Sequence, residues 1–274
     1  LSWAAGDAQA KGFLIGATSG RTTLNGEGLQ HQDGHSHILS STIPNCLSYD
    51  PAFAYEVAVI VKNGIKEMFV DQKNYFYYIT TINENYSHPE IPDGSESGII
   101  KGMYKLIDNE NAQIRLLGSG AILREAIKAK ELLEKFNIKA EVWSVTSFNL
   151  LRKDGMEVER FNQLNPSKEP SPSYVEQCFS DSDIPVIAAT DYMRSYSEQI
   201  RPYIKSTFFT LGTDGYGRSD SRETLRDFFE VNSKSISRAA SYALYKTKVI
   251  SEDQIVDIYK TLKVDTTKPN PWEV

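Results

Sequence analysis

The chain has 274 residues, of which 40% are hydrophobic and 11% aromatic; this is typical of a globular protein and excludes extended disorder. Its formal net charge is −6 and it has no basic run, so we expect no nucleic acid partner. No apolar stretch approaches the roughly 20 residues that cross a bilayer, and we expect a cytoplasmic protein without a membrane segment. The start, LSWAAGDAQAKG, has neither an initiator Met nor a signal-peptide pattern, and it indicates a fragment entered inside a domain.

The beginning of the chain predicts a small α/β unit. The apolar run KGFLIGATS is typical of a buried strand, and residues 39–51 place turns around a short extended piece. Asp50 and Pro51 then predict a helix start, and apolar residues at three- and four-residue spacing continue this helix to about Phe69. The aromatic and β-branched run YFYYITTI (75–82) predicts a strand buried on both faces.

The polar, proline-containing segment 83–98 predicts a linker, so we place a domain boundary there and expect domains of residues 1–90 and 91–274. In the second domain, apolar runs predict strands at 114–120, 140–148, 184–191 and 208–212. Helical patterns follow or separate them at 121–136, 195–204, 221–229 and 251–262. The last helix begins with a Ser-x-x-Gln capping pattern. This alternation predicts a doubly wound, mostly parallel sheet.

The stretch GEGLQHQDGHSH (26–37) concentrates the residues that carry chemistry: Glu27, His31, Asp33, His35 and His37. The spacing of its three histidines is compatible with a zinc site, although the central glycine suits neither the helix nor the strand that would bring the ligands together. Imidazoles beside acids also suit proton transfer at a substrate. The alternative without a catalytic or metal-binding role is a polar surface loop. The residues alone leave these three interpretations open.

Three glycine-rich stretches have some features of an anion-binding site. GATSGRTT (16–23) has Arg in place of the Lys that a P-loop needs, and GSG (118–120) lacks the third glycine and the acid of a dinucleotide fingerprint. We interpret GSG as a tight strand-to-helix turn. GTDGYGRSDSRETLRDFF (212–229) predicts a loop and a helix capped by Ser219 or Asp220. Its arginines could bind an anion or an acidic partner: Arg218, Arg222 and Arg226.

Seven motifs, in this order, carry a resemblance: FLIGATSGRTTLNGEGLQHQDGHSH, TIPNCLSYDPAFAYEVAVI, YYITTINENY, LLGSGAILREA, VWSVTSF, ATDYMRSYSEQIRPYI and LGTDGYGRSDSRETLRDFFEV. Together they resemble the homodimeric bacterial pyruvate dehydrogenase component of the pyruvate dehydrogenase complex, a member of the transketolase-like superfamily. The resemblance covers essentially the whole chain and about the C-terminal third of that enzyme. It implies an α/β fold in which part of a pyrimidine-binding domain precedes a transketolase C-terminal-like domain.

The resemblance also implies a reaction. The family decarboxylates pyruvate with thiamine diphosphate and Mg²⁺, and transfers the acetyl group to the lipoyl group of dihydrolipoamide acetyltransferase. By its position in the motif, His31 would face the covalent intermediate and Glu27 would belong to the same wall of the active site. Asp33, His35 and His37 would approach the substrate more weakly. The implied partners are a second subunit of a homodimer and the acetyltransferase component.

The chain departs from the family pattern in what it lacks. The GDG…N segment that holds magnesium and the diphosphate is absent, and so is the region of the glutamate that activates the cofactor. We therefore expect the main cofactor ligands to lie outside this chain and the isolated chain to be inactive. Gln32 also stands where some relatives carry an acid. Two alternatives remain: a non-catalytic dimerisation module and, more remotely, a zinc hydrolase that uses His31, His35 and His37.

Overall fold

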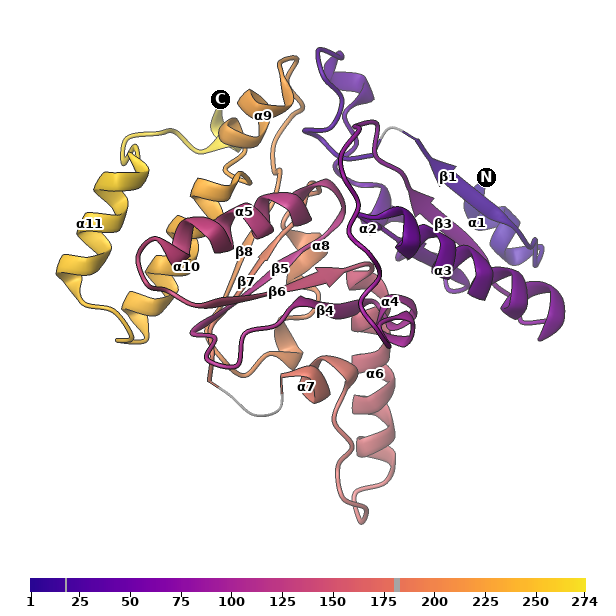
Figure 1. Ribbon diagram of the computed structural model, residues 1–274. Helices are drawn as coiled ribbons and strands as arrows, with labels where there is room; N and C mark the ends of the chain where they lie inside the picture. The colour runs from indigo at the N-terminus through magenta and orange to yellow at the C-terminus, as the bar shows by residue number, and fades with distance from the viewer. Residues whose placement is uncertain (18, 180–182) are drawn as a thin grey trace.

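The computed structural model describes residues 1–17, 19–179 and 183–274. These residues form a three-stranded sheet in the first third of the chain and a five-stranded sheet in the rest, which lie side by side in Figure 1. None of the helices in the described ranges is long and apolar enough to span a membrane.

The small sheet contains three parallel strands in the order β1-β3-β2. Their bounds are Phe13–Gly16 for β1, Cys46–Tyr49 for β2 and Phe76–Thr80 for β3. All three were predicted, and β3 is buried except for the half-buried Tyr78. The helix α3 (Ala54–Ile65) joins β2 to β3 and continues as a π-helical turn, Lys66–Val70. The short helices α1 (Ser2–Asp7) and α2 (Ser36–Ser40) were not predicted.

The predicted helix start at Asp50 is wrong. The helix α3 begins at Ala54, and the Glu56 carboxylate accepts hydrogen bonds from the amides of Ala52 and Phe53 at 2.6 and 3.0 Å. Glu56 therefore satisfies the free amides of the first turn that a cap at Asp50 would have served. Asp50 is buried instead, and accepts a hydrogen bond from the hydroxyl of Thr80 at 2.7 Å.

The large sheet has the strand order β4-β6-β5-β7-β8. Its strands are β4 (Met103–Ile107), β5 (Ile114–Gly118), β6 (Ala140–Val145), β7 (Val186–Ala189) and β8 (Phe208–Leu211). The last four are parallel, which confirms the predicted mostly parallel sheet. The edge strand β4 pairs antiparallel with β6 and was not predicted.

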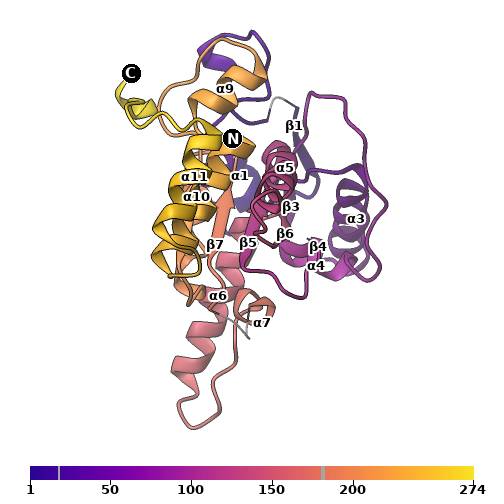
Figure 2. The ribbon, with the colours of Figure 1, turned by 60° about the vertical axis from the view of Figure 1, so that its left-hand side comes forward.

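Helices cover both faces of the large sheet, as Figures 1 and 2 show, so the predicted doubly wound architecture is confirmed. One core lies under α5 (Leu123–Glu134), α10 (Ser233–Lys246) and α11 (Glu252–Leu262). The opposite core is covered by α6 (Phe148–Leu164), α7 (Tyr174–Cys178) and α8 (Ser195–Glu198). The remaining helices are α4 (Glu96–Lys101) and α9 (Arg222–Phe228).

The bounds of three further elements can be compared with the sequence predictions. The strand predicted at 140–148 ends at Val145, because Ser147 caps α6 by accepting a hydrogen bond from the amide of Leu150. The region predicted as helical at 195–204 contains α8 and a separate 3₁₀ turn, Arg201–Tyr203. The capping box predicted for α11 is present between Ser251 and Gln254, and this prediction is confirmed.

Buried hydrogen bonds join the two sheets. The carboxylate of Glu56, on α3, accepts from the hydroxyls of Tyr104 on β4 and Ser144 on β6 at 2.7 and 2.6 Å. Burial raises the pKa of Glu56, and these donors partly offset that effect by stabilising its charged form. Ile99 of α4 shares a core with Ile60 of α3. Residues on both sides of the proposed boundary near residue 90 therefore pack together, and the boundary itself stays a proposal.

Candidate active-site wall

The segment before the histidine loop fills the position where open α/β sheets bind ligands. The strand order reverses between β5 and β7, and ligands bind at such a switch point, outside the carboxyl ends of the strands. Here Thr22 donates its amide and hydroxyl to Asp191, which follows β7, at 3.1 and 2.7 Å. Asp50 packs so tightly on Gly120, after β5, that a Cβ there would lie 2.5 Å from its carboxylate. The chain's own side chains thus occupy the switch point.

The histidine loop is fixed along its backbone by the loop that precedes α9. The amide of Gly26 donates to the carbonyl of Asp220 at 2.9 Å, and the Ser219 hydroxyl donates to the carbonyl of Gly26 at 3.2 Å. Farther along, the side-chain amide of Gln32 donates to the carbonyl of Arg218 and accepts from the Arg218 amide at 2.6 Å. Gln32 is only 5% exposed. The loop is therefore attached to residues 218–220 at Gly26 and at Gln32, on either side of Glu27 and His31.

Glu27 and His31 themselves point into solvent. Both residues are exposed, and neither side chain has a hydrogen-bond or ion-pair partner within the described part of the chain. His31 ends a short 3₁₀ turn, Leu29–His31, and Gln32 directly follows it. A fixed backbone that presents an imidazole and a carboxylate without partners leaves both groups available to a ligand.

Asp33 and His35 are committed to local contacts. The Asp33 carboxylate accepts hydrogen bonds from the amides of His35 and Ser36, at the start of α2, at 3.0 and 2.9 Å. The His35 Nε2 lies 3.0 Å from a guanidinium nitrogen of Arg21, which can only donate, so His35 accepts there. Arg21 is 3% exposed, and burial lowers its pKa. Arg21 was not among the predicted site residues.

His37 lies inside the protein. Its ring has no exposed surface, stacks on Tyr196 at 4.8 Å and meets the edge of Tyr192 at 4.6 Å. Its Nε2 lies 3.1 Å from the hydroxyl of Thr80. Burial lowers the pKa of His37 to about 3, so the ring is neutral at physiological pH. In this conformation no substrate can reach it, and the weaker expectation that His37 faces the substrate has no support here.

The three histidines of the loop do not form the zinc site that their spacing allowed. His31 is exposed, His35 contacts Arg21 and His37 is enclosed by tyrosines, so the three rings do not converge. Among the described residues, no group of three or more His, Cys, Asp or Glu side chains could hold a metal ion. The zinc hydrolase hypothesis therefore lacks the ligand cluster that it requires.

Two buried carboxyl groups near the loop were missed by sequence reasoning. Asp191 is 2% exposed, and burial raises its pKa to about 6 although Thr22 and Thr23 donate hydrogen bonds to it. Burial raises the pKa of Asp50 to about 7. Each of these residues follows a strand, Asp50 after β2 and Asp191 after β7. Nothing local in the sequence indicates that Asp191 is buried against Thr22 and Thr23, which lie about 170 residues earlier in the chain.

The arginines of the 212–229 segment are mostly used within the chain. Arg226 pairs with Glu84 at 2.9 Å, and Arg222 donates to the carbonyls of Thr23 and Asn83 at 2.7 and 2.5 Å. They therefore attach α9 to the first third of the chain rather than to an external acidic surface. The predicted cap at Ser219 or Asp220 is wrong by one or two residues, because Ser221 caps α9.

The GSG turn is confirmed as a tight strand-to-helix connection. β5 ends at Gly118, a 3₁₀ turn covers Gly120–Ile122, and α5 begins at Leu123. Gly120 has φ +47°, in the left-handed region that favours glycine. Packing of Asp50 against this residue explains the glycine without a dinucleotide.

Comparison with known proteins agrees with this architecture. Residues 1–89 match the family described as the pyruvate dehydrogenase E1 component middle domain, and residues 102–232 match the transketolase-like TK C-terminal domain. Among solved structures, a transketolase mutant from Pichia stipitis has a TM-score of 0.64 and 19% identity, over 90% of this chain and 33% of that chain. That similarity supports the fold.

Sequence relatives cover the whole chain. The pyruvate dehydrogenase E1 component of Pseudomonas aeruginosa is 54% identical over 100% of this chain and 32% of its own length. The corresponding protein of Escherichia coli K12 is 52% identical over 99% of this chain and 31% of its own length. The chain thus spans about a third of the length of these relatives. Along its whole length, the chain is thus similar to pyruvate dehydrogenase E1 components, and the two family models that it matches are their middle domain and a transketolase-like C-terminal domain.

Proposed function

We propose that this chain forms one wall of the active site of a thiamine-diphosphate-dependent pyruvate dehydrogenase component. The whole enzyme would decarboxylate pyruvate and transfer the acetyl group to the lipoyl group of dihydrolipoamide acetyltransferase. One observation supports the role of this chain: the backbone around Glu27 and His31 is clamped to residues 218–220, while both side chains are exposed. Groups that are fixed before the substrate arrives need little reorganisation during the reaction.

Two observations support anchoring of the cofactor by parts of the enzyme outside this chain. The switch point of the large sheet is filled by Thr22 and Asp50, and no ligand cluster for a metal ion occurs within the described ranges. Thiamine diphosphate would supply the electron-sink chemistry of the reaction when bound. We assign its anchoring, and that of Mg²⁺, to parts of the enzyme outside these 274 residues, and we expect the isolated chain to be inactive.

The residues of the loop have different proposed tasks. His31 is the candidate to donate a hydrogen bond or a proton to the oxygens of the pyruvate-derived intermediate, and Glu27 would orient neighbouring groups. Asp33 and His35 would act less directly, because Asp33 accepts from the Ser36 amide and His35 accepts from Arg21. His37 would support the wall by packing.

The homodimer and the acetyltransferase partner, with a cytoplasmic location, belong to the same proposal. Apolar side chains that lie uncovered at the edge strand β1 support an attached or partner segment: Leu14 is 43% and Ile15 is 53% exposed. The same observation favours the second candidate, a module that assists dimerisation without catalysis. The two candidate functions predict different effects of replacing His31 on turnover.

Replacement of His31 separates the candidates. A chimera in which this chain replaces the matching third of the Pseudomonas aeruginosa relative should form acetyl-lipoamide from pyruvate. His31→Ala should lower its turnover by about 10²-fold, as expected for a lost proton-transfer or charge-stabilising group. His88→Ala, at a histidine outside the loop whose ring accepts a hydrogen bond from the Ala54 amide, is the control for loss of a structural imidazole. Turnover of folded His31→Ala within about twofold of the parent chimera, below roughly 0.5 kcal/mol, would leave only the structural role.

A further inference from the structure

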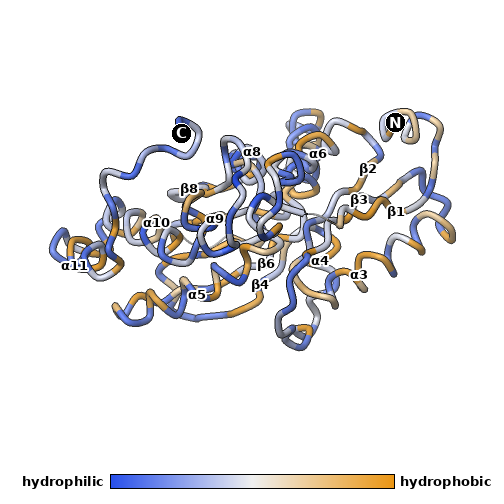
Figure 3. Tube along the Cα trace, turned by 90° about the horizontal axis from the view of Figure 1, so that it is seen from above, coloured by the Kyte–Doolittle hydropathy of each residue, from blue (hydrophilic) through white to orange (hydrophobic). Residues whose placement is uncertain are grey.

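A pocket of about 460 Å³ lies beside β8, the edge strand of the large sheet. Its other walls come from α10, α11 and the C-terminal tail after α11, which Figure 3 shows as a largely hydrophilic segment. None of the five residues predicted as site residues lines it. We propose that this pocket binds a small molecule that combines a planar aromatic ring with an anionic group. This inference goes beyond the proposed function and does not depend on it.

Size supports a ligand of this class. Pockets that enclose small molecules usually measure about 300–1,000 Å³ and combine apolar walls with a few polar groups. The pocket beside β8 falls within this range, and it lies between rigid elements, β8 and the fourteen-residue helix α10. It is therefore a preformed recess of about the size of a mononucleotide.

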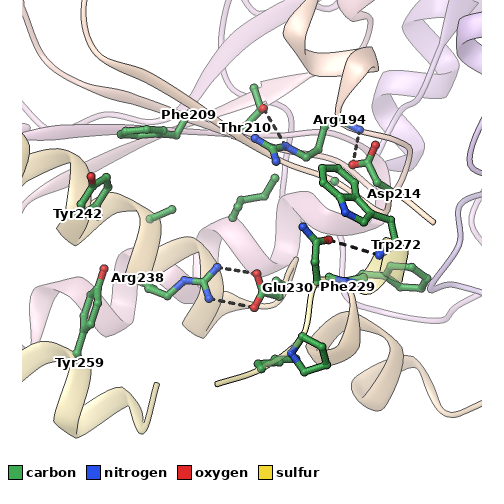
Figure 4. Close-up of a pocket in the computed structure, with 17 residues that line it drawn as sticks. Arg194, Phe209, Thr210, Asp214, Phe229, Glu230, Arg238, Tyr242, Tyr259 and Trp272 are labelled. Carbon is green, nitrogen blue, oxygen red and sulfur yellow. Dashed lines mark hydrogen bonds and ion pairs between the residues drawn. The ribbon is translucent and has the colours of Figure 1, made fainter. Parts of the chain in front are cut away.

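Aromatic side chains form the walls that would accept the ring. Phe209 and Tyr242 pack with ring centroids 5.6 Å apart, and Trp272 of the tail lies across the pocket from them (Figure 4). Tyr242 and Trp272 remain 45% and 55% exposed, so both retain surface that a planar ligand could cover. Stacking on such surfaces accepts many kinds of ring, because every aromatic ring offers a π-face.

Charge favours an anion. Three cationic side chains line the pocket against two acids, and one of these cations, Lys268, also pairs with Asp227 at 3.2 Å. Both acids are engaged: Glu230 binds Arg238 through two hydrogen bonds of 3.1 and 2.9 Å, and Asp214 accepts from the Arg194 amide. The Arg194 guanidinium, by contrast, has no ion pair within the part of the chain that the structure describes. Figure 4 shows it at one end of the pocket, where it could bind a phosphate or carboxylate.

Calorimetry of the 274-residue chain with three probes tests both halves of the ligand. Adenosine 5′-monophosphate carries a ring and an anion, adenosine has only the ring, and ribose 5-phosphate has only the anion. We expect the monophosphate to bind at least tenfold more tightly than either of the other two. Binding of the monophosphate no tighter than that of adenosine or ribose 5-phosphate would overturn the proposal.

Matched variants locate the binding. Arg194→Gln should weaken binding of the monophosphate at least fivefold and leave binding of adenosine unchanged, and because Arg194 is exposed we expect the variant to fold. Arg160→Gln, at an exposed arginine of α6 outside the pocket, should change neither. Ala239→Trp, which places a large ring in the pocket, should weaken the binding of both adenosine 5′-monophosphate and adenosine. Circular dichroism checks that this variant is folded. Equal effects of Arg194→Gln and Arg160→Gln would mean nonspecific charge attraction and reject the site.

Discussion

At the scale of single residues, Gln32 holds the histidine loop in place through two hydrogen bonds to the backbone of Arg218. Gln32→Met keeps the length of the side chain but leaves both backbone groups without these partners. We expect the free energy of unfolding to fall by about 1–3 kcal/mol, the usual cost of unsatisfied buried polar groups. Urea unfolding measures this loss, and Gln30→Met makes the same change at an exposed neighbour. Similar losses in the two variants would contradict the clamp.

The burial of Asp50 leads to a second prediction, on how the stability of the protein depends on pH. Burial raises its pKa from 3.8 to about 7 in the folded protein. Between these values the unfolded chain releases a proton that the folded chain keeps, so stability falls as pH rises toward 7. Asp50→Asn removes this titration. We expect urea unfolding to show the variant gaining stability relative to wild type between pH 5 and pH 8, whereas Asp93→Asn, at an exposed site, should not. A pH-independent difference would refute the assigned burial effect.

At the scale of elements, the turn between β5 and α5 depends on a glycine. Gly120 and Gly94 both have positive φ angles, +47° and +74°, so alanine is strained at either position. Only at Gly120 would the new Cβ meet another group, the Asp50 carboxylate at 2.5 Å. Gly120→Ala should therefore lower the free energy of unfolding by about 1–3 kcal/mol more than Gly94→Ala, the usual range for overpacking. Equal losses in urea unfolding would show that strain alone matters.

Elements with a clear apolar pattern were predictable, and two long helices were not. On α10 the buried residues Ile236, Ala240 and Leu244 do follow helical spacing, but serines share the buried face with them and weaken the apolar pattern. On α6 only Phe148, Leu151 and Gly155 are buried among 17 residues, because the helix extends away from the sheet (Figure 2). Propensity and pattern indicate a helix best when one whole face enters the core.

The candidate site was predictable in composition and less so in geometry. The clustering of histidines and the family resemblance identified the loop, yet they could not distinguish the exposed His31 from the enclosed His37. That difference arises from Tyr192 and Tyr196, which lie more than 150 residues farther along the chain. The same holds for the Gln32 clamp, whose partner is Arg218. Long-range contacts decide the environment of each side chain, and local sequence does not contain them.

At the scale of the whole molecule, the two sheets form one interdependent structure. Thr22 reaches Asp191, Glu56 reaches Ser144, and the loop before α9 holds the histidine loop. The first two contacts are buried, and in each a polar group of one part is satisfied by a donor of the other. Loss of such a partner within the folded protein would leave a buried polar group unpaired. The residues proposed for catalysis thus depend on the large sheet for their position, although they precede it in sequence.

This interdependence predicts cooperative unfolding. Hydrogen exchange at increasing urea should show β3 (Phe76–Thr80) and β7 (Val186–Ala189) losing protection over the same range of concentration, because buried contacts tie the small sheet to the large one. Thr22→Val, which removes the hydroxyl that donates to Asp191, should move both transitions to lower urea together. Loss of protection in β3 well before β7 would show that the small sheet unfolds separately, and would support the boundary near residue 90 as a division between independent folding units.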